Sequence, residues 1–191
     1  MKLSKRTKRK LIGLALSLVL LGVGYMVNHK GQPPAVLGTT SPGFYKVTSF
    51  ADGDTITVDM DGTEEKIRMI GVDTPETHDP RKAVQCFGQA ASDYTKQLIG
   101  SQPVRLVADP LGTNRDRYDR LLRYIYLPDG RLVEAEIIKG GYGFAYTSFP
   151  FGKSDEFKQF ETEAKAANRG LWGSCQPTTN QYGGQTSNPA Q

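Results

Sequence analysis

Histidine and cysteine, the side chains that most often bind transition metals, are scarce in this sequence. The chain of 191 residues has two of each. His29 and His78 have no partner at the spacing of a zinc site, so the composition argues against a zinc centre. We expect His78 to be an exposed loop residue without a catalytic role. Any metal site must therefore be built from oxygen ligands.

The main body of the chain also lacks an excess of positive charge. Seven of the 24 basic residues lie among the first 30 positions, and all 20 acidic residues come after them. Residues 31–191 therefore carry 17 basic and 20 acidic groups, a net charge of −3. This balance excludes a surface coated with positive charge. Binding of nucleic acid must depend on a few placed cations.

Long apolar runs are rare, and the longest lies close to the N-terminus. Residues 1–10 are strongly basic, and residues 11–27 form an uncharged apolar run of 17 residues. This pattern predicts a hydrophobic helix that is either a cleaved export signal or an uncleaved membrane anchor. The positive flank predicts that the N-terminus stays inside. The rest of the chain is then an extracellular domain held at the cell membrane, or a secreted one if the segment is cleaved.

Two further segments lack any periodicity. Residues 28–43 contain several Pro, Gly, Thr and Ser residues, which is typical of a linker. Residues 176–191 carry no charge and are rich in Gly, Thr, Asn and Gln, so we expect a disordered tail. Residues 44–175 remain as a single folded domain.

The pattern of that domain predicts an α+β fold. Alternating apolar residues predict five strands, over 44–50, 55–59, 67–72, 104–107 and 121–127. Helical spacing predicts three helices, over 85–99, over 132–139, and from an N-cap at Ser154 to about residue 168. A helix between the third and fourth of five strands predicts a Greek-key barrel of the oligonucleotide-binding (OB-fold) kind, preceded here by the N-terminal hydrophobic helix.

The third predicted strand ends in a group of charged residues. Arg68 lies within the strand, and Asp73-Thr74-Pro75-Glu76 follows it. Because proline fixes its own φ and restricts the residue before it, Asp73 and Glu76 leave the strand in a defined fork. A cation followed at once by two acids suits a metal ion and a phosphate held side by side. The alternative is an Asx-turn that closes the strand, with Arg68 and Glu76 as a surface ion pair.

Two other charged segments strengthen the first interpretation. Asp52-Gly53-Asp54-Thr55 precedes the second strand, and Arg115-Asp116-Arg117-Tyr118-Asp119-Arg120 lies in the loop before the fifth. Alone, the former is an ordinary turn and the latter a solvated charge run. Together with the fork, they supply oxygen ligands for Ca²⁺ or Mg²⁺, guanidinium groups that match phosphate oxygens, and a carboxylate that can hold a water.

In these motifs the sequence resembles the thermonuclease family, the staphylococcal nuclease-like enzymes. Asp-Gly-Asp-Thr, Ile-Arg-x-x-x-Val-Asp-Thr-Pro-Glu, Asp-Arg-Tyr-Asp-Arg and Gly-Leu-Trp occur in the family's order, over about residues 44–175. The resemblance implies a five-stranded OB-fold barrel with three helices. It also implies a Ca²⁺-dependent endonuclease, a phosphodiesterase that hydrolyses DNA and RNA to leave 3′-phosphate ends.

The resemblance assigns roles to individual residues. Asp54 and Asp73 match the calcium carboxylates of the family, and Thr74 matches its calcium-binding backbone carbonyl. The catalytic positions of the family correspond to Arg68 and Arg120 as phosphate clamps and to Glu76 as general base.

Three further positions match residues that contact the substrate. Arg117 and Tyr118 correspond to substrate-end and base-contacting positions, and Tyr146 to a stacking aromatic. Ser148 stands where well-known members carry a second tyrosine. This difference leaves the depth of the base-stacking pocket open, and Phe149 is a candidate replacement. Each stacked base contributes about 1–3 kcal/mol.

Cys86 and Cys175 have two interpretations, a disulfide or a pair of buried free thiols. Export of the domain favours the disulfide. It would close a loop of about 90 residues and add about 4 kcal/mol to stability in the chain-entropy model.

Two other functions remain open at this point. The first is a catalytically inactive nucleic-acid-binding OB-fold module anchored at the cell surface. The second is a structural or adhesion domain of the cell envelope, which would leave the set Arg68, Asp73, Glu76 and Arg120 without a purpose. The expected partners are DNA and RNA, and the membrane through residues 11–27 if these are not cleaved. We expect no obligate protein partner.

Overall fold

The computed structural model describes residues 43–77, 83–179 and 184–189. The hydrophobic N-terminal helix and nearly all of the linker lie outside these residues, so both stay predictions. Within the described ranges, no helix combines the length and the apolar character that crossing a membrane requires.

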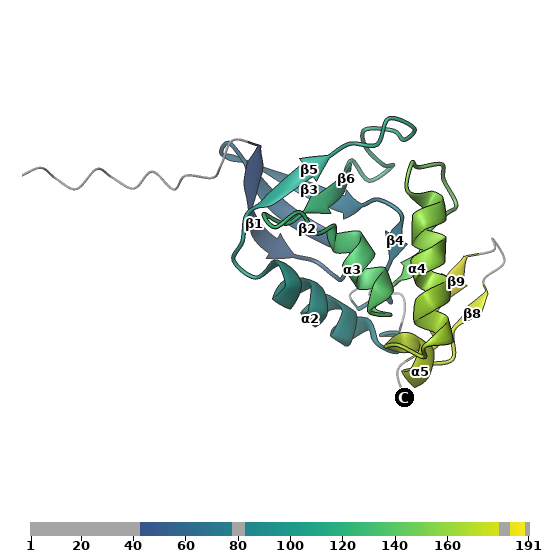
Figure 1. Cartoon of the computed structure of the whole chain (residues 1–191). Helices are drawn as coiled ribbons and strands as arrows, with labels where there is room; N and C mark the ends of the chain where they lie inside the picture. The colour runs from purple at the N-terminus through teal and green to yellow at the C-terminus, as the bar shows by residue number, and fades with distance from the viewer. Residues whose placement is uncertain (1–42, 78–82, 180–183, 190–191) are drawn as a thin grey trace, which may run out of the picture. The chain divides into compact units, whose positions relative to one another are not determined.

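Five strands form a closed barrel, as the sequence predicts (Figure 1). In chain order they are β1 (Phe44–Phe50), β2 (Thr55–Met60), β3 (Thr63–Met69), β5 (Val104–Val107) and β6 (Leu121–Tyr126). Around the barrel the order is β1-β2-β3-β6-β5, and β1 pairs with β5 to close it. Strand β3 runs parallel to β6, while the other neighbours are antiparallel. This topology confirms the Greek-key OB-fold barrel.

The barrel follows from the alternation of apolar residues. Ile56 and Val58 of β2 and Ile67 and Met69 of β3 are buried in one core, because every second residue of a strand faces the same side. The Asp61-Gly62 turn joins these two strands. Asp61 has φ of 56° and Gly62 has φ of 90°, which matches the twist of a two-residue hairpin.

Strand β3 ends earlier than predicted. The sequence predicts one strand over 67–72, whereas β3 stops at Met69 and a separate strand β4 (Val72–Asp73) pairs with β7 (Phe144–Ala145). Gly71 breaks the strand, with φ of 74°. A Cβ atom at Gly71 would lie 2.6 Å from the ring of Phe151, so both the conformation and the space require glycine. The break carries the chain out of the barrel immediately before the predicted site.

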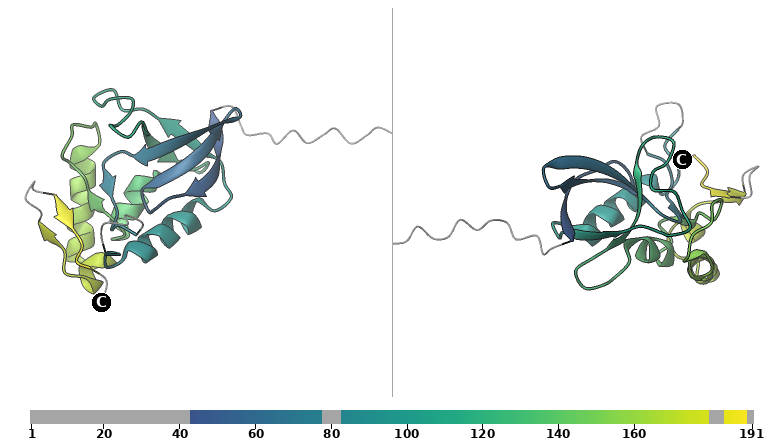
Figure 2. Two further views of the ribbon diagram at one scale, coloured as in Figure 1. Left: turned by 180° about the vertical axis from the view of Figure 1, so that it is seen from behind. Right: turned by 90° about the horizontal axis from the view of Figure 1, so that it is seen from above.

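Helices cover one side of the barrel (Figures 1 and 2). They are α2 (Gly88–Ile99), α3 (Val133–Lys139), α4 (Ser154–Ala166) and the short α5 (Leu171–Ser174). Helix α2 begins three residues later than predicted, because Phe87 is left-handed with φ of 70°. The predicted N-cap at Ser154 is wrong. Lys153 holds that position, and among the described residues no side chain caps α4.

The prediction of a disordered tail over 176–191 is also corrected for the described part of that segment. Strands β8 (Thr178–Thr179) and β9 (Gln185–Thr186) form a hairpin beside α4 (Figures 1 and 2). Composition suggests disorder because the segment has few apolar residues to bury. The observed order depends instead on hydrogen bonds to the segment around Cys86.

Candidate active site

Strand register brings the three charged segments of the sequence together. Thr55 of β2 lies opposite Arg68 of β3, and Arg68 lies opposite Leu122 of β6. Asp54 and Arg120 are therefore close neighbours of Arg68, although they are far apart in the sequence. Strand β4 then brings Asp73 to the same edge of the barrel.

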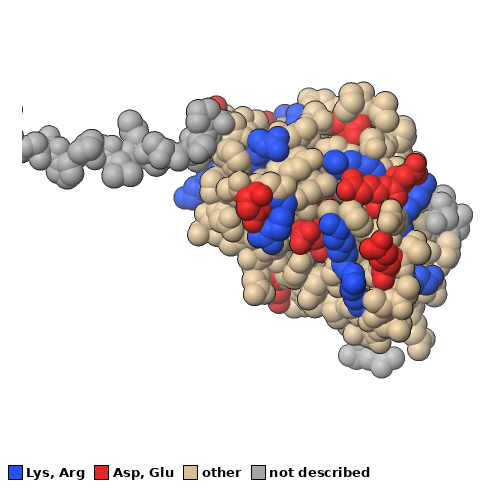
Figure 3. Space-filling view, viewed as in Figure 1, with Lys and Arg blue, Asp and Glu red and all other residues tan. Residues whose placement is uncertain are grey.

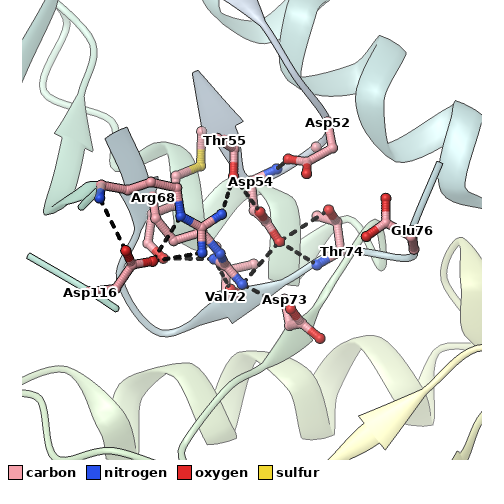
Figure 4. A network of polar contacts seen from close by, with 12 residues as sticks. Asp52, Asp54, Thr55, Arg68, Val72, Asp73, Thr74, Glu76 and Asp116 are labelled. Atoms are coloured by element: carbon pink, nitrogen blue, oxygen red, sulfur yellow. Dashed lines mark hydrogen bonds and ion pairs between the residues drawn. The ribbon is translucent and has the colours of Figure 1, made fainter. Parts of the chain in front are cut away.

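Asp54 is buried at the centre of this group (Figure 4). Its Oδ2 accepts hydrogen bonds from the backbone N–H of Thr74, at 2.9 Å, and from the Thr74 hydroxyl, at 3.2 Å. Its Oδ1 accepts a hydrogen bond of 3.1 Å from the hydroxyl of Thr55. These bonds fix the carboxylate and tie the start of β2 to the Asp-Thr-Pro-Glu turn.

Arg68 bridges the two acids predicted to bind metal. Its Nη2 lies 3.2 Å from Asp54 Oδ2 and 2.8 Å from Asp73 Oδ1. Its Nη1 donates to the backbone carbonyls of Met69, at 2.9 Å, and Val72, at 2.6 Å. The same guanidinium therefore holds both acids and the bend between β3 and β4. The alternative of a surface ion pair between Arg68 and Glu76 does not fit this partly buried arrangement.

Asp52 adds a further acid beside Asp54, for which the sequence suggested no separate role. Its Oδ1 accepts a hydrogen bond of 3.1 Å from the Asp54 N–H. Burial, and then the negative charge of Asp54, raise the pKa of Asp52 to about 7. The Asp-Gly-Asp spacing was the signal for this pair.

Arg120 is held by Asp116, which lies in the same charged segment before β6. Arg120 Nη2 lies 2.7 Å from Asp116 Oδ2, and its Nε donates to the same oxygen at 2.8 Å. Asp116 Oδ1 also accepts the backbone N–H groups of Tyr118 and Arg120. Partial burial opposes ionisation, but these hydrogen bonds hold the pKa of Asp116 below its usual value. Arg120 Nη1 then reaches Thr55 Oγ1 at 3.4 Å, next to Asp54.

Comparison with known proteins shows the family to which this chain belongs. The family model for staphylococcal nuclease homologues matches residues 66–174. A thermonuclease of Staphylococcus hyicus is 35% identical over 169 residues, which cover 88% of this chain and 98% of that protein. The chain belongs to the staphylococcal nuclease family. The resemblance read from the motifs is thereby confirmed.

Other relatives differ in how much of their length this chain matches. A thermonuclease of Staphylococcus intermedius is 35% identical, with 83% of this chain and 93% of that protein covered. Endonuclease YncB of Bacillus subtilis is 40% identical over 131 residues, which cover 68% of this chain and 61% of that protein. The similarity to the thermonucleases thus extends over nearly their full length, and that to YncB over 61% of its length.

The oxygen atoms of this family member suit calcium. The carboxylates of Asp54 and Asp73 and the carbonyl of Thr74 are hard ligands, and the hydrogen bond from the Thr74 N–H to Asp54 brings the start of β2 to the turn that holds Asp73 and Thr74. Across the described ranges, no cluster of three or more His, Cys, Asp or Glu side chains has an arrangement that could hold a metal ion. A bound ion would therefore combine the two carboxylates with backbone and water oxygens.

The predicted substrate residues lie at the edges of the site. The Tyr118 side chain is 63% exposed, and the guanidiniums of Arg117 and Arg120 lie 4.9 and 5.4 Å from its ring centroid. Tyr146 lies 6.1 Å from Phe149, which is 68% exposed. These exposed rings can stack on bases without unfolding any part of the core.

A cavity of about 160 Å³ is lined by the two chain neighbours of Tyr146, Ala145 and Thr147, but not by Tyr146 itself. Thr147, Ser148 and Lys158 line it together with Gln185 of β9. The small Ser148 side chain thus borders open space rather than filling it with a second aromatic ring.

The surface agrees with the charge balance of the sequence. Figure 3 shows acidic and basic side chains interspersed on the face seen in Figure 1. On that face, the described residues form no continuous basic surface.

Cys86 and Cys175 form a disulfide, which confirms the first of the two interpretations. It links the turn before α2 to the residue after α5. The cross-link joins the two ends of the helical part of the domain.

Proposed function

We propose that this protein is a Ca²⁺-dependent endonuclease that hydrolyses DNA and RNA and leaves 3′-phosphate ends. The observation that carries the proposal is the buried Asp54 carboxylate, which contacts Thr74 and Arg68 and lies next to the Thr55 hydroxyl that Arg120 reaches. Oxygen ligands and guanidinium donors thus converge on one point. Family membership and the names of the thermonuclease and endonuclease relatives support the reaction class.

The chain's own residues divide the work of phosphodiester hydrolysis. Asp54, Asp73 and the Thr74 carbonyl would hold Ca²⁺, which when bound supplies positive charge beside the phosphodiester. Arg68 and Arg120 donate hydrogen bonds to the phosphate oxygens on which charge develops.

Both guanidiniums are engaged before substrate arrives. Arg120 is oriented by Asp116, which leaves its Nη1 directed to the Thr55 hydroxyl, and Arg68 is oriented by Asp54 and Asp73. For Arg120, little reorganisation is then needed when the phosphate binds. For Arg68, donation to the phosphate through an Nη atom replaces one of its present bonds to Asp54, Asp73, Met69 or Val72.

The fork has two acids, Asp73 and Glu76. Asp73 pairs with Arg68, and Figure 4 draws no dashed line between Arg68 and Glu76. We assign Glu76 to the attacking water, which it orients and from which it accepts a proton. Arg117, Tyr118 and Tyr146 bind the nucleotides on either side of the reacting phosphate. Breaking the bond to the 5′ oxygen leaves the phosphate on the 3′ end.

Cleavage assays test this proposal. Purified protein should cleave single-stranded DNA and RNA in Ca²⁺ and lose activity in excess chelator. The 3′ ends of the products should be ligatable to a 5′-phosphorylated adaptor only after a 3′-phosphatase treatment. Binding of DNA without cleavage in any divalent cation would instead support an inactive binding module, and neither binding nor cleavage would support a structural domain.

We further propose that the domain acts outside the cytoplasm, as a membrane-held or secreted protein. Support comes from the basic residues 1–10, the apolar run 11–27, and the disulfide, which persists in oxidising compartments. Cell fractionation tests this. Membrane-bound full-length protein indicates an anchor, and a shorter form in the medium indicates cleavage. Activity confined to the cytosol, with both cysteines reduced, would contradict it.

A further inference from the structure

The side chain of Gln85 connects the turn that carries Glu76 to the C-terminal segment of the chain. Its Oε1 accepts the backbone N–H of Glu76 at 2.8 Å, and the Gln85 N–H donates to the Glu76 carbonyl at 2.9 Å. Its Nε2 donates to the hydroxyl of Thr186 at 3.2 Å. Both ends of one amide are thus used, which fixes the orientation of the side chain.

The C-terminal segment is itself attached to the same turn. The Cys86 N–H donates to the Asn188 carbonyl at 2.7 Å, and the buried Ser187 hydroxyl donates to the Cys86 carbonyl at 2.8 Å. The disulfide joins Cys86 to Cys175, and the Gln176 N–H donates to Asn188 Oδ1 at 3.2 Å. Residues 185–188 therefore lie against residues 85–86 through backbone and side-chain hydrogen bonds, and the disulfide attaches Cys175, the residue before Gln176, to the same turn.

Glu76 lies in a part of the chain that does not belong to the barrel. It lies beyond the end of β4, a strand of two residues. Its Oε1 accepts a hydrogen bond from the adjacent Thr77 N–H at 2.9 Å, which orients the side chain but not the backbone. Gly88, the first residue of α2, packs so closely on this turn that a Cβ there would lie 2.9 Å from the Glu76 carbonyl oxygen. That contact also depends on where residues 85–88 are held.

We propose that Gln85 is a positioning residue for Glu76, and that residues 185–188 complete the active site by holding Gln85 in place. The inference rests on the proposed function, because the position of Glu76 matters for turnover only if Glu76 serves the attacking water. Substrate binding uses other residues, so the effect should appear in kcat rather than in KM. A displacement of about 1 Å at a reacting group can lower the rate about 100-fold.

Two pairs of variants separate positioning from general stability. Gln85→Met keeps the length of the side chain and removes both hydrogen bonds, and Gln89→Met makes the same change on the exposed face of α2, where Gln89 bonds Asp93. Thr186→Val removes the acceptor of Gln85 with little change in shape, and Thr186→Ser restores it. Each variant is compared with wild type by kcat, KM and melting temperature. Hydrogen exchange of the backbone amides of Thr74, Glu76 and Thr77 is also measured, in the absence of metal and substrate.

We expect Gln85→Met to lower kcat about tenfold with KM within about twofold, and to speed exchange of the Glu76 amide. Thr186→Val should give a smaller loss in the same direction, while Thr186→Ser and Gln89→Met should match wild type. Wild-type kcat and unchanged exchange in Gln85→Met and Thr186→Val would overturn the inference. So would losses that follow melting temperature alone in all four variants. If Gln85→Met does not fold, the Thr186 pair decides.

The proposed function can fail separately. An inactive wild-type protein would refute the nuclease proposal, and the catalytic part of this inference with it. The hydrogen-exchange comparison would still establish whether residues 185–188 hold the turn at Glu76.

Discussion

The guanidinium of Arg68 lies 3.2 Å from the carboxylate of Asp54, and the two side chains are only 13% and 6% exposed. Each is the main counter-charge of the other inside the protein. Removing Arg68 therefore leaves the buried Asp54 carboxylate without its counter-charge, which destabilises a protein by several kcal/mol, whereas removing Asp54 leaves Arg68 paired with Asp73 at 2.8 Å. Variants at this pair must keep charge or volume if their effects on catalysis are to be interpreted.

Arg68→Lys keeps the charge but cannot reproduce the fork of donors to Asp54, Asp73, Met69 and Val72. We expect kcat to fall about 100-fold or more, with a loss of stability of about 1–2 kcal/mol from the missing hydrogen bonds. Steady-state kinetics and thermal unfolding of the same preparation measure both. Near-wild-type turnover would contradict the role of Arg68 as a phosphate clamp.

Arg120→Lys should lower kcat by a similar factor with a smaller effect on stability, because its partner Asp116 lies in a loop rather than at a strand end. Arg131→Lys is the matched control, since Arg131 pairs with Asp129 in a turn near α3, outside the candidate site. The control should behave as wild type. If Arg120→Lys is as active as the control Arg131→Lys, Arg120 has no part in phosphate binding.

Glu134 is a buried acid that the sequence analysis did not single out. Its carboxyl oxygens accept the N–H of Ile125 at 3.1 and 3.2 Å, which joins the start of α3 to β6. Burial raises the pKa of Glu134 to about 8, even though these hydrogen bonds lower it. The unfolded carboxyl loses its proton near its ordinary pKa of 4.5, whereas the folded one keeps it until about pH 8. The free energy of unfolding therefore falls as the pH rises through this interval.

Glu134→Gln should remove that dependence, because an amide does not titrate. We expect the stability of wild type relative to this variant to decrease by a few kcal/mol between pH 5 and pH 8. Urea unfolding at several pH values measures the difference, and other titrating groups contribute equally to both proteins. Parallel stability curves would show that Glu134 ionises normally in the folded state.

The disulfide should stabilise the domain through the unfolded chain. Cys86 and Cys175 are 89 residues apart, and the chain-entropy model gives about 4 kcal/mol for a loop of this length. We expect Cys86→Ser with Cys175→Ser to lower the free energy of unfolding by about 2–4 kcal/mol. Chemical unfolding of the oxidised protein, the reduced protein and the double variant provides the measurement. Equal midpoints for all three would rule out this contribution.

Much of the barrel could be predicted because apolar residues recur at every second position, as at Ile56 and Val58 of β2 and Ile67 and Met69 of β3, and because the β2–β3 turn carries an Asp-Gly signal. The Asp54, Arg68 and Asp73 group was also predictable, since the resemblance placed each residue in a motif. The break at Gly71 was not, because it depends on the ring of Phe151, which lies far along the chain. The ordered C-terminal hairpin escaped prediction for a similar reason. Its stability depends on Cys86 and Gln85, not on its own polar sequence.

The most direct test of the account measures calcium binding and DNA cleavage in parallel for wild type, Asp54→Asn, Asp73→Asn and Glu76→Gln. The aspartate variants should weaken calcium binding, because each removes one of two anionic ligands. Glu76→Gln should keep calcium affinity within a few-fold and lower kcat by about 100-fold or more, as expected when the group serving the water is removed. Titration calorimetry and initial rates of cleavage give both quantities. If Glu76→Gln loses calcium as severely as Asp54→Asn does, or if wild type cleaves DNA equally well in chelator, the assignment of this site is wrong.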